Sequence, residues 1–299
     1  MSHHPKVTII MISFNHSKYL EECLSSIKNQ TYSNLELIVT DDASTDNSVK
    51  VIEDWLKKNK FTAIKIFHKV NTGLATMLNQ CFKYANGKYI KFISGDDFLH
   101  SDSIQKSVKK LEDLGNEYGM IFTDTYVVDE NSNKIDDIAD YNKLGNIDKF
   151  EFRDELLKGN RIAALTVLMR TEVLKETGYY NPDILLEDYY KWLQINEKYF
   201  IGYIPEKLSY YRKHNFNISK IKESQINLEV LYLQILFDKK GFLQNRFSYE
   251  LLIRYLNKIY IPKYIIRAYG NYPYRNKRLN FAFKYNIPII LYRFINKFL

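Results

Sequence analysis

The chain has 299 residues and a net charge of +8, and 45% of its residues are hydrophobic and 26% charged. These proportions are those of a soluble globular protein, so a disordered, collagen-like or disulfide-stapled chain is excluded. No apolar run approaches the ~20 residues that cross a bilayer, and Val7–Ile12 is too short for a secretory signal. With only two cysteines, Cys23 and Cys81, we expect a reduced, cytoplasmic protein.

The charge is unevenly distributed along the chain. From Lys239 onward the sequence carries +12, because Glu250 is the only acid there, whereas the preceding residues carry −4. A mildly acidic body followed by a strongly basic tail predicts two units with different partners.

Strand and helix patterns alternate through the first half of the chain. Val7–Ser13 is a continuous apolar run, typical of a parallel strand that is buried on both faces. Apolar residues then recur at helical spacing from Tyr19 to Ile27, with Ser17 as a candidate N-cap. The alternation continues with strand Leu35–Thr40, helix 49–56, strand Ala63–His68, helix Leu74–Ala85 and strand Tyr89–Ser94. This order predicts an α/β fold with a mainly parallel sheet, in which ligands bind at the carboxyl ends of the strands.

The alternation of strands and helices becomes less regular in the second half of the chain. A helix over Ser103–Leu114 and a strand over Met120–Val128 precede a polar stretch, Asp129–Asn146, that predicts a long loop. Short apolar pieces follow at Ala163–Met169, Trp192–Ile195, Tyr203–Ile204 and Leu208–Tyr211. Beyond Ile221 the sequence is helical in pattern and rich in basic and aromatic residues. We therefore expect an α/β domain over residues 1–220 and a helical C-terminal region over 221–299.

Two acidic clusters stand where predicted strands end. Asp41-Asp42 follows the second strand, and a turn with a helix cap is the commoner role of such residues. Asp96-Asp97 follows a buried strand through Ser94-Gly95, where the glycine permits a tight turn. Two adjacent carboxylates suit a hard divalent cation, although a capped turn is equally compatible with this cluster.

A third acidic cluster, Glu187-Asp188, precedes the helical pattern of Tyr189–Lys198. Acids at such a position stabilise a helix N-terminus more often than they take part in catalysis. Each of the three clusters, taken alone, leaves a purely structural role open.

Taken together and in order, the clusters resemble a known family. The segment PKVTIIMISFNHSKYLEECLSSIKNQTYSNLELIVTDDASTD is similar to the opening of the family 2 inverting glycosyltransferases, which have the GT-A fold, a nucleotide-sugar-binding, Rossmann-like sheet. The resemblance extends over about residues 5–220 and includes four further motifs: Asn71-Thr72-Gly73-Leu74-Ala75, Ser94-Gly95-Asp96-Asp97, Leu186-Glu187-Asp188-Tyr189 and Tyr211-Arg212-Lys213-His214.

The resemblance implies a nucleotide-sugar donor, with a UDP-sugar favoured. Phe14 would lie near the base, and Asp41 would accept a hydrogen bond from it. Asp42 would lie beside Asp41 in the same pocket.

The resemblance also implies a divalent metal site for Mn²⁺ or Mg²⁺. Asp96 would bind the ion that bridges the phosphates of the donor, Asp97 would support Asp96, and His214 would complete the site or contact the diphosphate. A hydrogen-bonded histidine at a strand end is an equally compatible role for His214. Ser94 stands where the family has the first aspartate of its Asp-x-Asp motif, so the hydroxyl would hydrogen-bond the sugar and metal affinity would be weaker.

In this family Asp188 matches the catalytic base and Glu187 shapes the acceptor site. A single displacement by an acceptor hydroxyl would invert the anomeric configuration, and the transferred sugar would be a hexose or an N-acetylhexosamine. The Gln-x-x-Arg-Trp signature of processive synthases is absent, so we expect transfer of one sugar to a glycan or lipid-linked acceptor, as in bacterial surface-polysaccharide synthesis.

Three other classes of protein are less compatible with the sequence. An oxidoreductase of the dinucleotide-binding type or a sugar nucleotidyltransferase would need a glycine-rich loop after the first strand, where Ser13-Phe14-Asn15-His16 stands. A nucleic-acid-binding protein would use the basic tail, but its apolar residues are too periodic for a solvated phosphate-binding arm. We expect instead that the tail forms helices packed on the catalytic domain and presents a basic and aromatic face to an anionic membrane surface. A homodimer interface is the alternative, and the two could coexist.

Overall fold

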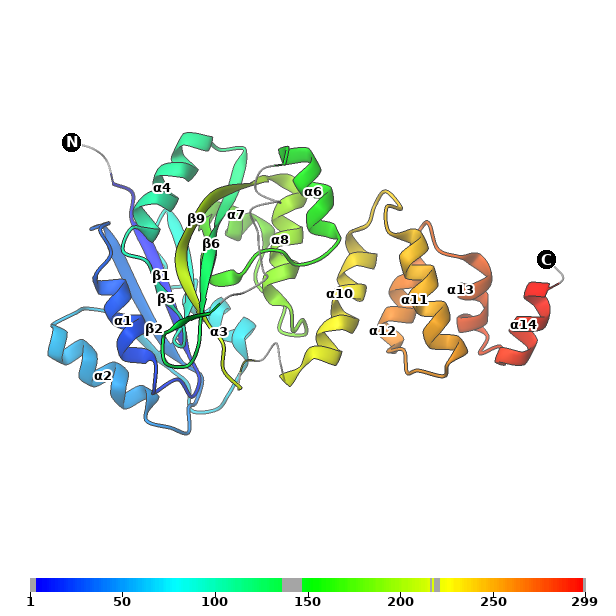
Figure 1. Ribbon diagram of the computed structural model, residues 1–299, viewed down its shortest axis with the longest axis horizontal. Coiled ribbons are helices and arrows are strands. Elements are labelled where there is room, and N and C mark those ends of the chain that lie inside the picture. Colours follow the sequence, from blue (N-terminus) through cyan, green and yellow to red (C-terminus); the bar gives the residue numbers. More distant parts are fainter. Residues whose placement is uncertain (1–3, 136–146, 216, 218–220, 298–299) are drawn as a thin grey trace. The chain divides into compact units, whose positions relative to one another are not determined.

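The computed structural model describes residues 4–135, 147–215, 217 and 221–297 (Figure 1). The chain forms two compact units. The first spans Met1–Leu156 and Asn160–Ile221, and the second spans Leu157–Gly159 and Lys222–Leu299.

A mixed sheet lies at the centre of the first unit. Its strands are β1 (Val7–Ser13), β2 (Leu35–Asp41), β3 (Ile64–Phe67), β4 (Tyr89–Ser94), β5 (Phe98–Leu99), β6 (Tyr118–Val128), β7 (Lys134–Ile135), β8 (Leu168–Arg170) and β9 (Phe200–Arg212). They follow the order β3-β2-β1-β4-β8-β6-β9-β5, with β7 beside β6. The first four strands pair in parallel, as do β6 and β9, whereas β8 runs antiparallel to β4 and β6. The predicted α/β fold is confirmed.

Helices cover both faces of this sheet (Figure 1). They are α1 (Leu20–Lys28), α2 (Ser48–Asn59), α3 (Leu74–Cys81), α4 (Ser103–Leu114), α6 (Lys149–Leu157), the 3₁₀ turn η1 (Ala164–Thr166), α7 (Thr171–Thr177) and α8 (Glu187–Lys198). The apolar residues of α1, α2 and α4 form one core cluster with alternate residues of the strands, such as Ile9 and Met11. Because successive strand residues point to opposite faces, Phe92 packs on the other side, against Phe82 and Tyr180.

Some sequence predictions differ from the structure. Ser17 does not cap α1, because its backbone N–H donates to the Asp46 carboxylate (3.0 Å) and the residue before the helix is Tyr19. The apolar pieces Tyr203–Ile204 and Leu208–Tyr211 belong to one bent strand, β9, which pairs with β6 through register shifts. The predicted loop Asp129–Asn146 contains the short strand β7, and its residues 136–146 lie outside the described residues.

One charged side chain lies in the middle of the sheet. Lys91, on β4, is fully buried, and its Nζ has no hydrogen-bond partner among the described residues. Burial lowers the pKa of Lys91 to about 7, because the interior disfavours the ammonium form. A buried amine without a hydrogen-bond partner costs stability, and no contact among the described residues offsets this cost.

We therefore expect Lys91→Met to stabilise the protein. In the unfolded chain the amine ionises near 10.4, so between about pH 7 and 10 the unfolded state binds more protons and wild-type stability rises with pH. The methionine variant should unfold with a free energy higher by on the order of 2–4 kcal/mol at pH 7, with a flatter pH dependence in this window. Urea unfolding at several pH values measures both, and Lys109→Met on the exposed face of α4 is the control. A less stable K91M would contradict the argument.

The second unit is helical. Its helices are α10 (Glu223–Phe237), α11 (Gln244–Leu256), α12 (Lys263–Asn271), α13 (Lys277–Lys284) and α14 (Ile289–Lys297). They share a separate core that includes Leu231, Phe247, Ile265 and Tyr269. The helical pattern predicted beyond Ile221 is thus confirmed. Within the described residues, no helix is both long and apolar enough to traverse a bilayer.

Candidate active site

The carboxyl ends of β1, β2 and β4 meet at one edge of the sheet. Parallel pairing sets Ser13 beside Asp41 and Ile12 beside Ser94. Past the strand ends the backbones remain joined, because Asp42 N–H donates to Ser13 O (3.0 Å) and Gly95 N–H donates to Ile12 O (2.7 Å). The first two acidic clusters therefore lie on the same side of the sheet, as the sequence predicts.

Gly95 permits this close approach of β4 to α1. A Cβ at this position would lie 2.8 Å from Leu20 Cδ2 and 3.2 Å from His16 Nδ1. Any other residue would push the Asp96-Asp97 turn away from the loop that follows β1.

Ser44 links the loops after β1 and β2. Its N–H and hydroxyl donate to the two oxygens of Asp41 (2.8 and 2.6 Å), and the same hydroxyl oxygen accepts from Asn15 N–H (2.8 Å). Asp41 is fully buried, whereas the neighbouring Phe14 is 42% exposed. The ends of β1 and β2 thus carry a fixed carboxylate and an accessible aromatic ring, a combination suited to a planar base.

Asp42 holds the loop before α3. Its carboxylate accepts from Thr72 N–H (2.9 Å), the Thr72 hydroxyl (3.1 Å) and Gly73 N–H (2.8 Å), and it lies 3.0 Å from His68 Nδ1. Because both carboxylate oxygens accept hydrogen bonds from Thr72 or Gly73, Asp42 holds the loop before α3 in place beside the site.

Two histidines converge on Asp96. His214 Nε2 lies 3.0 Å from Asp96 Oδ2, and His16 Nε2 lies 3.7 Å from the same oxygen. The His214 ring stacks on Tyr19, with centroids 5.5 Å apart. Residues 118 positions apart are thus joined at the end of β4.

The electrostatics of the two adjacent aspartates differ. Burial alone would raise the pKa of Asp96, but the hydrogen bond from His214 and the nearby His16 lower it to about 2. Burial and the charge of Asp96 raise the pKa of Asp97 well above its usual value. Asp96 therefore ionises more readily than Asp97, and burial lowers the pKa of His16.

Arg212 organises the turn around these aspartates. Its backbone N–H donates to Asp97 Oδ1 (2.9 Å), and its fully buried guanidinium donates to Asp96 O (2.8 Å). The guanidinium also pairs with Glu22 of α1 (2.5 Å). One arginine at the end of β9 therefore ties β4, α1 and the acidic turn together.

The side chains around Asp96 can supply part of the coordination shell of a divalent cation. Asp96 Oδ1 and His16 Nδ1 are buried and have no hydrogen-bond partner among the described residues. A carboxylate and an imidazole are ligands that Mn²⁺ accepts. The described residues contain no set of three or more Asp, Glu, His or Cys arranged as a metal site, so Asp96 and His214 would leave coordination positions to phosphate oxygens and water.

Glu187 and Asp188 lie in the first turn of α8, rather than before the helix as the sequence pattern predicts. The nearby ring of Tyr180 packs on Phe82 and Phe92, and Phe92 stands two residues before Ser94 on β4. Burial raises the pKa of Tyr180, and the charges of Glu187 and Asp188 raise it further. The start of α8 thus lies within electrostatic range of Tyr180, whose ring packs on Phe92 of β4.

The environment of Asp188 opposes the effect of its position in the first turn of a helix. Its Oδ1 accepts from Tyr189 N–H (2.5 Å) and its Oδ2 from Asn160 Nδ2 (3.1 Å). Burial nevertheless raises the pKa of Asp188 above its usual value, where the helix position alone predicts a lowered one. A carboxylate of raised pKa is a stronger proton acceptor.

Three residues of this edge were assigned no role from the sequence: His16, Arg212 and Asn160. His16 follows Phe14 by two positions at the same strand end, and Arg212 lies inside the quoted Tyr211–His214 motif, so position could have marked both. Nothing in the local sequence marks Asn160, whose contact with Asp188 spans 28 residues.

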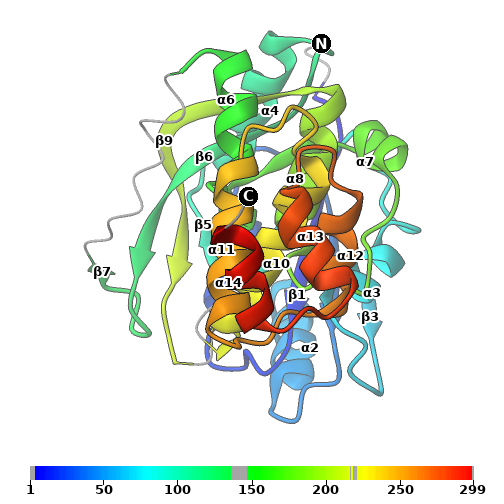
Figure 2. The same ribbon diagram turned by 90° about the vertical axis from the view of Figure 1, so that its right-hand side faces the viewer.

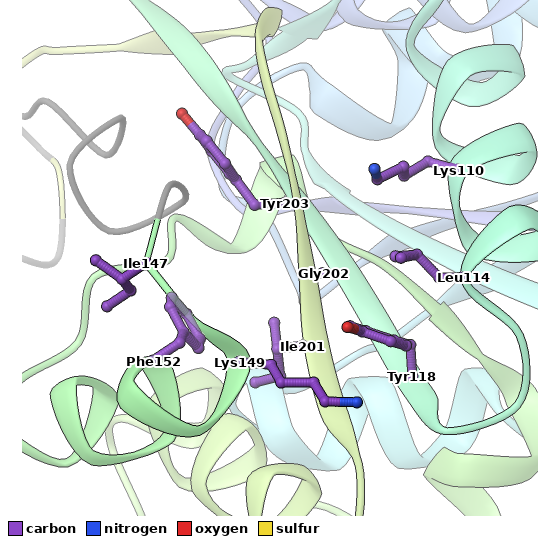
Figure 3. Close-up of a pocket in the computed structure, with 9 residues that line it drawn as sticks. All are labelled: Lys110, Leu114, Tyr118, Ile147, Lys149, Phe152, Ile201, Gly202 and Tyr203. Atoms are coloured by element: carbon purple, nitrogen blue, oxygen red, sulfur yellow. The ribbon is translucent and has the colours of Figure 1, made fainter.

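A separate pocket of about 170 Å³ lies near the amino ends of β6 and β9 (Figure 3). Lys110, Tyr118, Lys149 and Tyr203 are among its lining residues. The strands run from this pocket toward Asp124 and Arg212, so it belongs to the opposite end of the sheet. None of the site residues predicted from the sequence lines it.

Comparison with known families and proteins agrees with this geometry. The family model described as Glycosyl transferase family 2 matches residues 8–177, more than half of the chain. An uncharacterized glycosyltransferase of Haemophilus influenzae is 32% identical over 185 residues, which are 62% of this chain and 69% of that protein. The putative glycosyltransferase EpsE of Bacillus subtilis is 27% identical over 272 residues, with about nine-tenths of both chains covered (90% and 91%).

Solved structures share the fold at lower identity. TarS residues 1–349 of S. aureus, in complex with UDP-GlcNAc, matches with a TM-score of 0.66 at 19% identity and covers 92% of this chain and 82% of its own. The mannosyltransferase PcManGT of Pyrobaculum calidifontis, in complex with GDP-Man and Mn²⁺, matches with a TM-score of 0.64 at 17% identity. The match covers 99% of this chain and 84% of PcManGT. The GT-A fold expected from the sequence is confirmed.

Proposed function

The chain belongs to glycosyl transferase family 2, and we propose that it transfers a single sugar from a nucleotide-diphosphate sugar with inversion of the anomeric centre. The observation that carries the proposal is the edge where β1, β2 and β4 end. There an exposed aromatic ring, a buried carboxylate and the Asp96–His214 pair lie on adjoining loops.

The donor would bind with its base at the β1 and β2 loops. Phe14 offers a ring for stacking, and Asp41 retains lone pairs that can accept the N3–H of uracil. A UDP-sugar is our preferred donor, because TarS is complexed with UDP and with UDP-GlcNAc. A hexose and an N-acetylhexosamine both suit this class of donor.

The diphosphate would lie against the turn after β4. Asp96 and His214 would hold Mn²⁺ or Mg²⁺, and Asp97, fixed by Arg212, would keep that turn in place. PcManGT is complexed with Mn²⁺, which supports a divalent ion here. A bound ion would offset the negative charge that develops on the leaving diphosphate. Ser94, at the end of β4, would hydrogen-bond the sugar through its hydroxyl.

The acceptor hydroxyl would lose its proton to Asp188. The raised pKa of this carboxyl favours proton uptake, and Asn160 and Tyr189 N–H hold its orientation. Glu187, in the same helical turn, would line the acceptor side. One ionised carboxylate on the face opposite the leaving group is sufficient for a single displacement.

We further propose a glycan or lipid-linked acceptor and peripheral attachment to an anionic membrane surface through the second unit. That unit contains the whole tail from Lys239 onward, which carries +12. A homodimer interface on the same unit is compatible with this role.

The donor proposal is tested by thermal unfolding with a panel of nucleotide sugars, with and without Mn²⁺. A UDP-sugar at a hundredfold excess over its Kd should raise the Tm by about 5 °C, since ligand binding then adds about 2.7 kcal/mol to the folded state. GDP- and CDP-sugars should have smaller effects.

The control for this test compares two phenylalanines that both have exposed rings. Phe14→Ala should weaken nucleotide binding about tenfold, because it removes a stacking surface. Phe150→Ala removes another exposed ring (60% exposed), on α6, and should leave nucleotide binding unchanged. Equal effects of the two variants, or no stabilisation by any UDP-sugar, would contradict the proposed donor site.

A further inference from the structure

The second unit has two helix connections at one of its ends, at the bottom of the α11–α14 bundle in Figures 1 and 2. One joins α11 to α12 through residues 257–262, and the other joins α13 to α14 through residues 285–288. The Tyr255 hydroxyl, near the end of α11, donates to the Ile287 carbonyl, and its ring lies 5.2 Å from that of Tyr292. The two connections therefore form one continuous surface.

Each connection packs one isoleucine against the core of the unit. The surface that the two connections form also exposes apolar side chains. Ile261 and Ile287 pack against the core cluster of the unit. Beside them, Tyr260 is 75% exposed and Ile290 is 85% exposed. We call the following exposed residues the loop face: Lys258, Ile259, Tyr260, Lys263, Tyr264, Lys284, Tyr285 and Ile290.

The charge of the loop face has one sign. Its three lysines are exposed, and no acid is among its residues. Glu250, the only acid from Lys239 onward, lies on α11 and pairs with Arg254 (3.4 Å). A cationic patch with aromatic and aliphatic tips is complementary to an anionic surface that has an apolar layer beneath it.

We propose that the loop face binds the surface of an anionic phospholipid bilayer, which deepens the proposed function by assigning the membrane contact to defined residues. Ile259 and Ile290 enter the boundary of the acyl chains, and the tyrosines lie at headgroup level. The lysines contact the headgroups, where each basic residue strengthens binding about fivefold.

The opposite end of the unit provides an internal comparison. There the α10–α11 and α12–α13 connections meet, because the Tyr272 hydroxyl donates to Asp238 Oδ2 (2.6 Å). This end is also basic, with Lys239, Lys240 and Lys277 exposed. It has fewer exposed apolar side chains, so charge and apolar insertion can be tested separately.

The experiment is vesicle flotation of the full chain with phosphatidylcholine alone or mixed with phosphatidylglycerol. Wild-type protein should float only with the mixed vesicles. The apolar variant I259S/Y260S/I290S and the charge variant K258E/K263E/K284E should each lose binding by about tenfold or more. Two controls lie outside the loop face and should retain most of the binding: F242S/Y249S, which removes two exposed rings, and K239E/K240E/K277E, which changes the same number of lysines.

Three outcomes would overturn the proposal. The first is no flotation of the wild type with mixed vesicles, and the second is an equal loss in the controls and the loop-face variants. The third is a dimer in solution that I259S/Y260S/I290S dissociates while lipid binding stays absent, which would assign the loop face to a second copy of the chain.

Donor binding provides an independent readout. Stabilisation by a UDP-sugar depends on the first unit alone, so it should be unchanged in every loop-face variant. Unchanged stabilisation with no flotation would refute the loop face only. Flotation with no stabilisation by any nucleotide sugar would refute the donor site only.

Discussion

Asp188→Asn is expected to lower kcat by on the order of 10²–10⁴ while leaving the donor Kd almost unchanged. Asparagine has nearly the same shape and can still accept from Tyr189 N–H, but it cannot take the proton of the acceptor hydroxyl. Measurement of kcat and of the nucleotide Kd on the same variant separates catalysis from binding.

The same substitution should not destabilise the fold. Because burial raises the pKa of Asp188 above its unfolded value, the ionised form costs stability at neutral pH, and a neutral amide removes that cost. We therefore expect an unchanged or higher Tm together with the loss of turnover. If Asp188 only stabilised the helix, turnover would stay intact and stability would change by about 1 kcal/mol or less.

The pH dependence provides a further check on this role. Wild-type kcat/KM should fall as the pH drops through the raised pKa of Asp188, since the protonated carboxyl cannot accept a proton, and should be constant above it. The residual activity of D188N should lack this acidic limb. Asp183→Asn, an exposed substitution five residues earlier, is the control, and a fully active D188N would contradict the mechanism.

Asp96→Asn should abolish the Mn²⁺-dependent part of nucleotide binding and lower turnover by on the order of 10²-fold or more. The substitution removes the carboxylate whose pKa is lowered and leaves His214 facing a neutral amide. Because Arg212 is tied to the Asp96 backbone carbonyl, and not to its side chain, the turn should keep its shape.

Calorimetric titration with UDP in the presence and absence of Mn²⁺ measures this effect directly. Asp113→Asn, on the exposed surface of α4, removes the same charge elsewhere and should bind UDP as the wild type does. Full turnover of the wild type in excess EDTA would contradict a role for the metal. Because Ser94 replaces an acid of the family motif, the metal dependence should be weaker than in relatives that retain it.

The sequence by itself determined the alternation of strands and helices and the edge at which the acidic residues gather. Both follow from local rules: apolar periodicity selects each element, and parallel strands bring their carboxyl ends to one side. The positions of Asp41 and Asp42 at the end of β2, and of Asp96 after β4, therefore needed no knowledge of long-range contacts. The family resemblance added roles that periodicity alone does not contain.

Only the tertiary structure decided how those side chains are engaged. Both oxygens of Asp42 are taken up by the Thr72–Gly73 loop, 30 and 31 residues away. His16, Asp96 and His214 meet because β1, β4 and the residues after β9 end at one place, a contact between distant segments that no local pattern encodes. The raised pKa of Asp188 and the unpartnered Lys91 depend in the same way on burial, which is a property of the packed chain and not of the residue.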